Sequence, residues 1–194
     1  MAGHALEQKL LAGSGSTRRW PNDEDVMESA FTRNIYFGIR IPALRIILER
    51  LELNSRGKKS EDNNVGSGLT IEHILPSNWS EFWPLQGKTI PKEIVSYPGS
   101  AEGDLLPLAE QIRDRNSKLQ TLGNLTLLND RANPAAGNYA FDKKKSEYEH
   151  SVLRLNRYFV DFENWDENSI RDRSQYLGKA FCSIWSRPLD GSPD

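Results

Sequence analysis

The sequence has little that would place the protein in a membrane or in a secretory compartment. Among its 194 residues there is one cysteine, Cys182, which excludes an internal disulfide and a zinc site built from several cysteines. No apolar run is long enough to span a bilayer, and residues 1–20 lack the basic start and the apolar core of a secretory signal. We therefore expect a soluble protein of the cytoplasm.

Positive charge is also scarce for a protein that would act on nucleic acid. The chain has 25 lysines and arginines against 27 aspartates and glutamates, a formal net charge of -2, whereas proteins that bind nucleic acid alone are usually basic. Any nucleic-acid site must therefore be local or shared with another domain. The basic residues do form clusters, each of which by itself is most simply a solvated helix face: Arg113 and Arg115; Arg131 with Lys143, Lys144 and Lys145; Arg154 and Arg157; Arg171 and Arg173.

The length suits a single buried core, which we place in residues 21–186, between a flexible lead-in over 1–20 and a tail over 187–194. Two short apolar strands are predicted at 69–76 and 125–128, and we expect them to pair as an antiparallel ribbon. Helical periodicity and capping residues predict helices over 22–36, 42–53, 103–116, 139–159 with an interruption near Ser151, and 168–185. The expected fold class is α+β, a mainly helical domain around a two-stranded antiparallel ribbon.

The connection over 77–100 is rich in Pro, Gly and Trp and has no clear period. Such long irregular connections often carry function, but they can also be inert. Trp79 and Trp83 within it could stack on a base or a sugar, although aromatic side chains in a loop more often anchor it to the core.

Four polar residues provide the combination that phosphodiester hydrolysis requires, which is a base to activate water and a cation to offset the charge on the phosphate. A neutral histidine is the base best matched to pH 7, and a carboxylate with an amide oxygen can hold Mg²⁺ while leaving waters on it. Glu72 and His73 stand side by side at the end of the first predicted strand. Asn124 precedes the second strand, and Asn133 follows nine residues later.

These residues lie in motifs that resemble the HNH, or ββα-metal, nuclease superfamily, with EHILP at the first strand and GNLTLLN at the second. The longer segments LQTLGNLTLLNDRAN and FDKKKSEY, with a distant Trp and a basic final helix ending in IW, are similar to the C-terminal nuclease domain of GmrSD-type modification-dependent restriction enzymes. Phosphorothioate-sensing defence nucleases of the SspE type carry a similar domain. The resemblance covers about residues 25–186 and implies a ββα-metal core over about 69–150, flanked by helices over 22–53 and 168–185.

The resemblance also implies a role for each matched position. His73 would be the general base, and Asn124 would hold the strand that carries it. Glu72 and Asn133 would ligate Mg²⁺ or Mn²⁺, since an Asn rather than a His at the third motif position favours an oxygen-rich site over a zinc site; Asn138 is the rival ligand. Contacts with phosphate are expected from three basic residues: Lys143, Lys144 and Arg131.

Each of these residues also has a purely structural interpretation. A single histidine in a strand is often only a half-buried residue, Asn124 after a glycine suits a turn, and Asn133 before a proline suits a helix cap. Neighbours on a regular strand point to opposite faces, so Glu72 and His73 enter one site only if the strand bends there. The short length of the strand and Pro76 favour such a bend.

Together the motifs predict a metal-dependent DNA endonuclease that nicks one strand and leaves 5′-phosphate and 3′-hydroxyl ends, as the effector domain of a restriction or antiphage defence protein. In the enzymes it resembles, a nucleotide-hydrolysing sensor domain precedes the nuclease, and no Gly-rich phosphate-binding loop occurs in this sequence. We therefore expect a covalently linked N-terminal domain of that kind as a partner. Two alternatives stay open: a catalytically silent DNA-binding or regulatory module, and an HNH-like ribonuclease.

Overall fold

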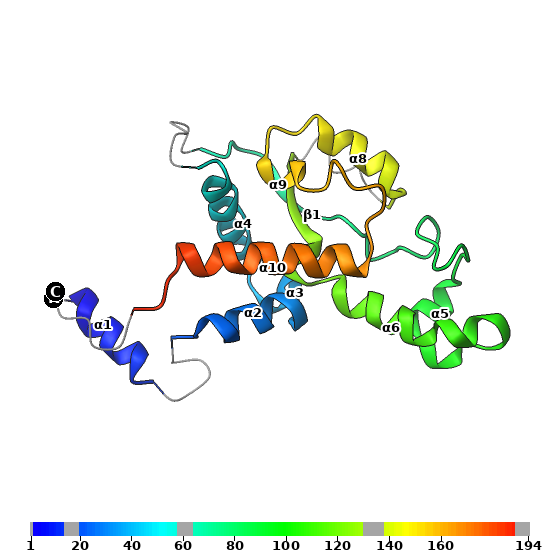
Figure 1. The fold of residues 1–194 in the computed structure, drawn as a ribbon, viewed down its shortest axis with the longest axis horizontal. Coiled ribbons are helices and arrows are strands. Elements are labelled where there is room, and N and C mark those ends of the chain that lie inside the picture. Colours follow the sequence, from blue (N-terminus) through cyan, green and yellow to red (C-terminus); the bar gives the residue numbers. More distant parts are fainter. Residues whose placement is uncertain (1, 14–19, 58–63, 130–137, 189–194) are drawn as a thin grey trace.

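The computed structural model describes residues 2–13, 20–57, 64–129 and 138–188. Helices surround one two-stranded antiparallel sheet (Figure 1), so the expected α+β fold is confirmed. None of the helices in this part of the chain is long and apolar enough to cross a membrane. The elements, in chain order, are α1 (Ala2–Leu11), α2 (Asp23–Thr32), α3 (Ile35–Gly38), α4 (Ile41–Ser55), β1 (Leu69–His73), α5 (Lys92–Ser96), η1 (Pro98–Ser100), η2 (Gly103–Leu108), α6 (Ala109–Lys118), η3 (Leu122–Asn124), β2 (Leu125–Asn129), α8 (Phe141–Glu149), α9 (Arg154–Arg157) and α10 (Glu167–Ile184).

The ribbon pairs β1 with β2 over their whole length, and it ends with His73 opposite Leu125. Strand β2 is buried on both faces. Leu125 and Leu127 pack in an apolar cluster with α4 and the second half of α10, whereas Leu128 packs in a second cluster with α6 and α8. The ribbon therefore lies between the two halves of the core, which fixes the position of its ends.

The N-terminal helices α2 and α4 begin where their capping residues and Pro42 predict. Asn22 and Asp25 form a reciprocal capping box at the start of α2, and Pro42 lies in the first turn of α4, where its missing N–H costs nothing. The helix expected over 22–36 is in fact two helices. Asn34 interrupts it, because its side chain accepts a backbone N–H at the start of α3 instead of continuing the helix.

The helices in the middle of the chain are shorter than the apolar pattern predicts. The segment expected as a helix over 103–116 begins as the 3-10 helix η2, which contains Pro107, a residue that cannot donate the hydrogen bond of a regular α-helix. The helix expected over 139–159 ends as α8 at Glu149 and resumes as α9 at Arg154. This break coincides with the interruption predicted near Ser151.

Two tryptophans fix the long connection over 77–100 to the core. Trp79 is fully buried and Trp83 is 6% exposed, and both belong to the cluster with α6 and α8. The interpretation of these side chains as anchors is therefore confirmed, and stacking on nucleic acid is not available to them. The connection also contains the short helices α5 and η1, which the sequence pattern did not predict.

Helix α10 crosses the molecule and holds the two halves together (Figure 1). Asp166 caps it by accepting the backbone N–H of Ser169 at 2.8 Å, and the helix packs against α2, α4, α6 and η3. Ile170 and Leu177 face the two clusters. The helix predicted over 168–185 is confirmed, and it lies directly behind the turn that leads into β2. Helix α1 lies within the segment that we interpret as a lead-in.

Candidate active site

Glu72 forms a buried ion pair with Lys144 of α8. The Lys144 Nζ lies 2.6 Å from Glu72 Oε1 and 2.6 Å from the backbone oxygen of His73, to both of which it donates. Lys144 is fully buried and Glu72 is 9% exposed. The helix directs Lys144 inwards because it shares a face with Phe141 and Tyr148, three residues before and four after, which pack in the core.

Burial works against both charges of this pair. It raises the pKa of the Glu72 carboxyl, and the Lys144 ammonium opposes that shift. It lowers the pKa of Lys144, and the Glu72 carboxylate opposes that shift in turn. The short contact between the two groups is therefore what keeps a charged pair in this environment.

His73 is held by a hydrogen bond and an aromatic contact of its ring rather than by an ion pair. Its Nε2 lies 2.8 Å from Gln120 Oε1, and the Tyr36 ring of α3 meets the imidazole edge-on with 4.6 Å between centroids. Burial lowers the pKa of His73; the hydrogen bond with Gln120 opposes that shift, and the nearby Lys144 ammonium reinforces it. The lowered pKa favours the neutral imidazole, which is the form that a general base requires.

Asn124 closes the end of the ribbon immediately after His73. Its Oδ1 accepts the backbone N–H of Leu75 at 2.8 Å, and its Nδ2 donates to the backbone oxygens of Leu75 and Leu119, both at 2.8 Å. Its own backbone oxygen accepts the N–H of Ile74 at 2.9 Å. Asn124 is fully buried, so it holds the neighbouring backbone segments in position and does not contact a substrate.

Helix α10 locks the turn that carries Asn124. Ser174 accepts the backbone N–H of Gly123 at 3.0 Å, and Arg173 donates to the backbone oxygens of Gly123 and Leu125 at 2.8 and 2.7 Å. The interpretation of the Arg171 and Arg173 cluster as a solvated face is wrong for Arg173, which is fully buried. Burial lowers its pKa to about 10, and its role here is to bind backbone oxygens.

Glu72 and His73 leave β1 on different sides. The pairing with β2 is regular through both residues, so their side chains alternate across the ribbon. Glu72 meets α8, whereas His73 meets α3 and the turn before η3. The bend that we expected at this point is not seen, and the two functional groups approach the strand end from opposite faces.

The other predicted residues are placed as follows. Lys143 is exposed, with its Nζ 4.4 Å from the centroid of the Tyr139 ring. Asn138 is exposed, too. Arg131 and Asn133 lie outside the described residues. Within the described ranges, no group of three or more His, Cys, Asp or Glu side chains gathers at a distance suited to a metal.

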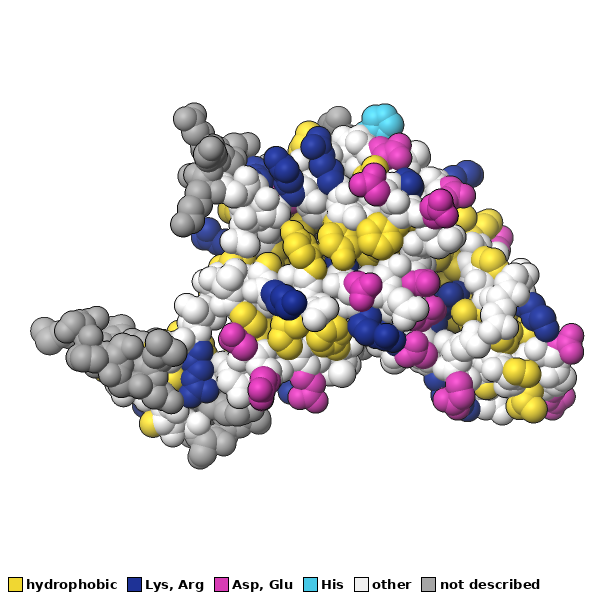
Figure 2. Space-filling model, in the orientation of Figure 1, with side chains coloured by type: hydrophobic (Ala, Val, Ile, Leu, Met, Phe, Trp, Pro, Cys, Tyr) yellow, Lys and Arg dark blue, Asp and Glu magenta, His cyan; other side chains and the backbone are white. Residues whose placement is uncertain are grey.

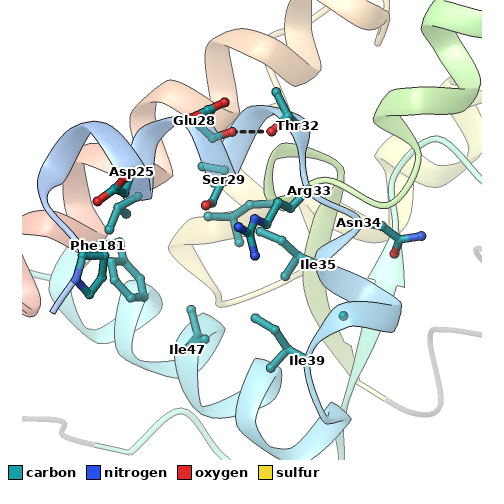
Figure 3. A pocket seen from close by; sticks show the side chains of 15 residues that line it. Asp25, Glu28, Ser29, Thr32, Arg33, Asn34, Ile35, Ile39, Ile47 and Phe181 are labelled. Atoms are coloured by element: carbon teal, nitrogen blue, oxygen red, sulfur yellow. Dashed lines mark hydrogen bonds between the residues drawn. The ribbon is translucent and has the colours of Figure 1, made fainter. Parts of the chain in front are cut away.

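A pocket of about 480 Å³ lies away from these residues, between α2, α3, α4 and α10 (Figure 3). Ile35, Ile39, Ile47 and Phe181 line it together with polar side chains of α2. None of the predicted site residues that the structure describes contributes to it. Helix α3 separates the pocket from the strand end, since the same short helix that supplies Ile35 to the pocket supplies Tyr36 to His73.

The distribution of charged side chains over the surface agrees with a nucleic-acid site that is local rather than spread over the domain. On the face shown in Figure 2, Lys and Arg side chains alternate with Asp and Glu and do not form an extended basic field. With a formal net charge of -2, long-range attraction of a polyanion by this chain is weak.

Sequence reasoning missed Gln120, Tyr36 and the structural use of Arg173. Gln120 and Tyr36 reach His73 through tertiary contacts, for which the sequence carries no signal. For Arg173 a signal was present, because it lies three residues after Ile170 and four before Leu177 on the apolar stripe of α10.

The arrangement defines a helical α+β domain with a half-buried histidine at the end of a two-stranded ribbon. The profile of the C-terminal domain of GmrSD restriction endonucleases matches residues 20–180. The chain therefore belongs to the family of GmrSD restriction endonuclease C-terminal domains, as the EHILP and GNLTLLN motifs predict. A search of curated proteins finds no match to the chain.

Proposed function

We propose that this domain is an HNH-type endonuclease that hydrolyses phosphodiester bonds in DNA and serves as the effector domain of a restriction or antiphage defence protein. The observation that carries the proposal is the His73 imidazole, held at the end of β1 by Gln120 and Tyr36 in a chain of a restriction endonuclease family. Helix α3, the turn before η3 and helix α8 all contact this residue, through Tyr36, Gln120 and Lys144.

In the proposed reaction, His73 accepts a proton from a water molecule as the water oxygen bonds to phosphorus. The bond from phosphorus to the 3′ oxygen breaks, and the products carry 5′-phosphate and 3′-hydroxyl ends. Asn124 fixes the backbone that follows His73, and Lys144 fixes the backbone oxygen of His73 itself. The base is therefore positioned before the substrate arrives. One such site cuts one strand, so nicking is the expected outcome.

The donor atoms of the candidate metal ligands suit Mg²⁺ or Mn²⁺ better than zinc. Glu72 is a hard oxygen donor whose hydrogen bond to Lys144 uses Oε1, and Mg²⁺ binds proteins through one or two carboxylates while keeping several waters. Glu72 and Asn133 would hold the ion, with Asn138 as the alternative to Asn133. When bound, the ion would stabilise the charge of the pentavalent phosphate and of the leaving oxygen.

Contacts with the DNA backbone are assigned to Lys143 rather than to its neighbour. Lys143 is exposed near the start of α8, whereas Lys144 would have to abandon Glu72 and leave a buried carboxylate without a partner. Arg131 remains a candidate for a second phosphate contact. Because the domain as a whole is slightly acidic, we assign most of the DNA affinity to a covalently linked N-terminal domain that hydrolyses nucleotide and senses modification.

The proposal is tested by incubating the protein with supercoiled plasmid and, separately, with RNA. We expect Mg²⁺ or Mn²⁺ to support conversion of supercoiled to open-circular plasmid, EDTA to abolish it, and RNA to stay intact. Plasmid that is bound but never nicked would identify a silent DNA-binding module, and degradation of RNA alone would identify a ribonuclease. Activity that persists in EDTA would exclude the metal.

A further inference from the structure

Gln120 is the only side chain among the described residues with a hydrogen bond to the His73 ring. It lies in the turn between α6 and η3, four residues before Asn124, and its Oε1 is 2.8 Å from His73 Nε2. Its own Nε2 donates to Ser77 Oγ at 3.2 Å. The amide is thus bonded at both of its polar ends, and its oxygen faces the imidazole.

This contact distinguishes the two neutral forms of the ring. A neutral imidazole carries its proton on one nitrogen and a lone pair on the other. The amide oxygen of Gln120 can only accept, so the form that bonds to it carries the proton on Nε2. The lone pair then lies on His73 Nδ1, on the side of the ring away from Gln120.

The backbone of Gln120 is fixed as firmly as its side chain. Its carbonyl oxygen accepts the N–H groups of Ile35 at 2.9 Å and Tyr36 at 3.3 Å, and the Tyr36 ring packs edge-on against His73. The same short segment therefore holds both the residue that bonds to the imidazole and the ring that limits its rotation. Because these contacts hold both the ring and its hydrogen-bond partner, they select one orientation of the His73 ring and one protonated ring nitrogen.

We infer that Gln120 is a positioning residue that holds His73 in the Nε2–H form, so that Nδ1 is the atom that removes the proton from water. This inference rests on the proposed function for its catalytic meaning, but the tautomer itself can be measured without any turnover. Gln120 does not touch the substrate in this arrangement. Its effect on cleavage passes entirely through His73.

The first measurement is the tautomer of His73 from two-bond nitrogen–proton couplings in ¹⁵N-labelled protein, with the signal assigned by its absence in His73→Ala. We expect the Nε2–H form in the wild type and in Gln120→Glu, whose carboxylate also accepts. In Gln120→Met, which keeps the side-chain length but cannot accept, we expect a mixture of both forms. An Nδ1–H ring in the wild type would overturn the inference.

The second measurement separates kcat from KM for plasmid nicking in Mg²⁺. In Gln120→Met we expect kcat to fall at least about tenfold with KM within about twofold, since a wrong tautomer in a serine protease costs a factor on the order of 10⁴. Gln120→Glu should recover most of this loss. Gln175→Met on the exposed face of α10 is the matched control and should nick like the wild type.

A wild-type kcat in Gln120→Met, with the ring shown to be a mixture, would also overturn the inference. A wild-type protein that nicks no DNA would instead contradict the proposed function, and the couplings would still report whether Gln120 selects the tautomer. The two failures are therefore distinguishable.

Discussion

The ion pair between Glu72 and Lys144 makes a quantitative prediction about stability. Lys144→Met keeps the length and apolar stem of the side chain but removes the ammonium, leaving a carboxylate that is 9% exposed without its partner. Breaking one partner out of a buried pair costs about 3–5 kcal/mol. Glu72 can escape part of this cost by taking up a proton, so we expect a loss of about 3 kcal/mol near pH 7, at the lower end of that range.

The assay is urea unfolding followed by tryptophan fluorescence, since the chain has five tryptophans. With a slope of about 2 kcal/mol per molar urea, the midpoint should fall by roughly 1.5 M. Lys143→Met, one residue earlier on an exposed face of α8, is the control and should shift the midpoint little. The double variant Glu72→Gln with Lys144→Met should be more stable than Lys144→Met alone, because it leaves no unpaired charge.

The direction in which the stability of Lys144→Met changes with pH follows from the pKa of Glu72. Burial already raises the pKa of Glu72 above its ordinary value of 4.5, and losing Lys144 raises it further. A folded state with the raised pKa binds more protons than the unfolded state, so stability falls as the pH rises above about 4.5. The loss in Lys144→Met should therefore be smaller at pH 5 than at pH 8. Equal midpoints for Lys143→Met and Lys144→Met at pH 8 would refute the reasoning.

Two further predictions concern the turn before β2. Asn124→Ala leaves the N–H and oxygen of Leu75 without their partners and should cost about 3 kcal/mol in urea unfolding; a loss under about 1 kcal/mol would show that this amide does not hold the strand end. Gly123→Ala would place a Cβ 2.1 Å from the backbone oxygen of Ile170, and should lower the melting temperature strongly. Gly38→Ala, whose Cβ meets nothing within 4 Å, is the control and should melt like the wild type.

The ribbon and its neighbours were predictable from the sequence because local signals agree there. LTIEH and LTLLN combine apolar and β-branched residues in short runs bounded by turn residues, and both form strands in the structure. Pro42 and Asn22 marked helix starts correctly. The family followed from the motifs on these same strands.

The side-chain environment of the candidate site was less predictable, because it depends on which face of each element is buried. Lys143 and Lys144 look equivalent in the sequence, yet one is exposed and the other reaches Glu72 through the core. The pattern of Phe141, Lys144 and Tyr148 at helical spacing carried that information, but a charged residue is expected on the solvated face. Gln120 gave no signal at all, because only tertiary folding brings it to the strand end.

The most direct test of the central claim is the rate at which folded His73→Ala nicks supercoiled plasmid in Mg²⁺, relative to wild type. His150→Ala is the control, since His150 is exposed beyond the end of α8, and in the described part of the chain its ring bonds to a backbone oxygen, that of Ser146. A general base contributes a factor of about 10²–10⁴, so we expect the His73→Ala rate to fall at least about 100-fold and the His150→Ala rate to stay unchanged. Nicking by His73→Ala at the wild-type rate would contradict the assignment of His73 as the base.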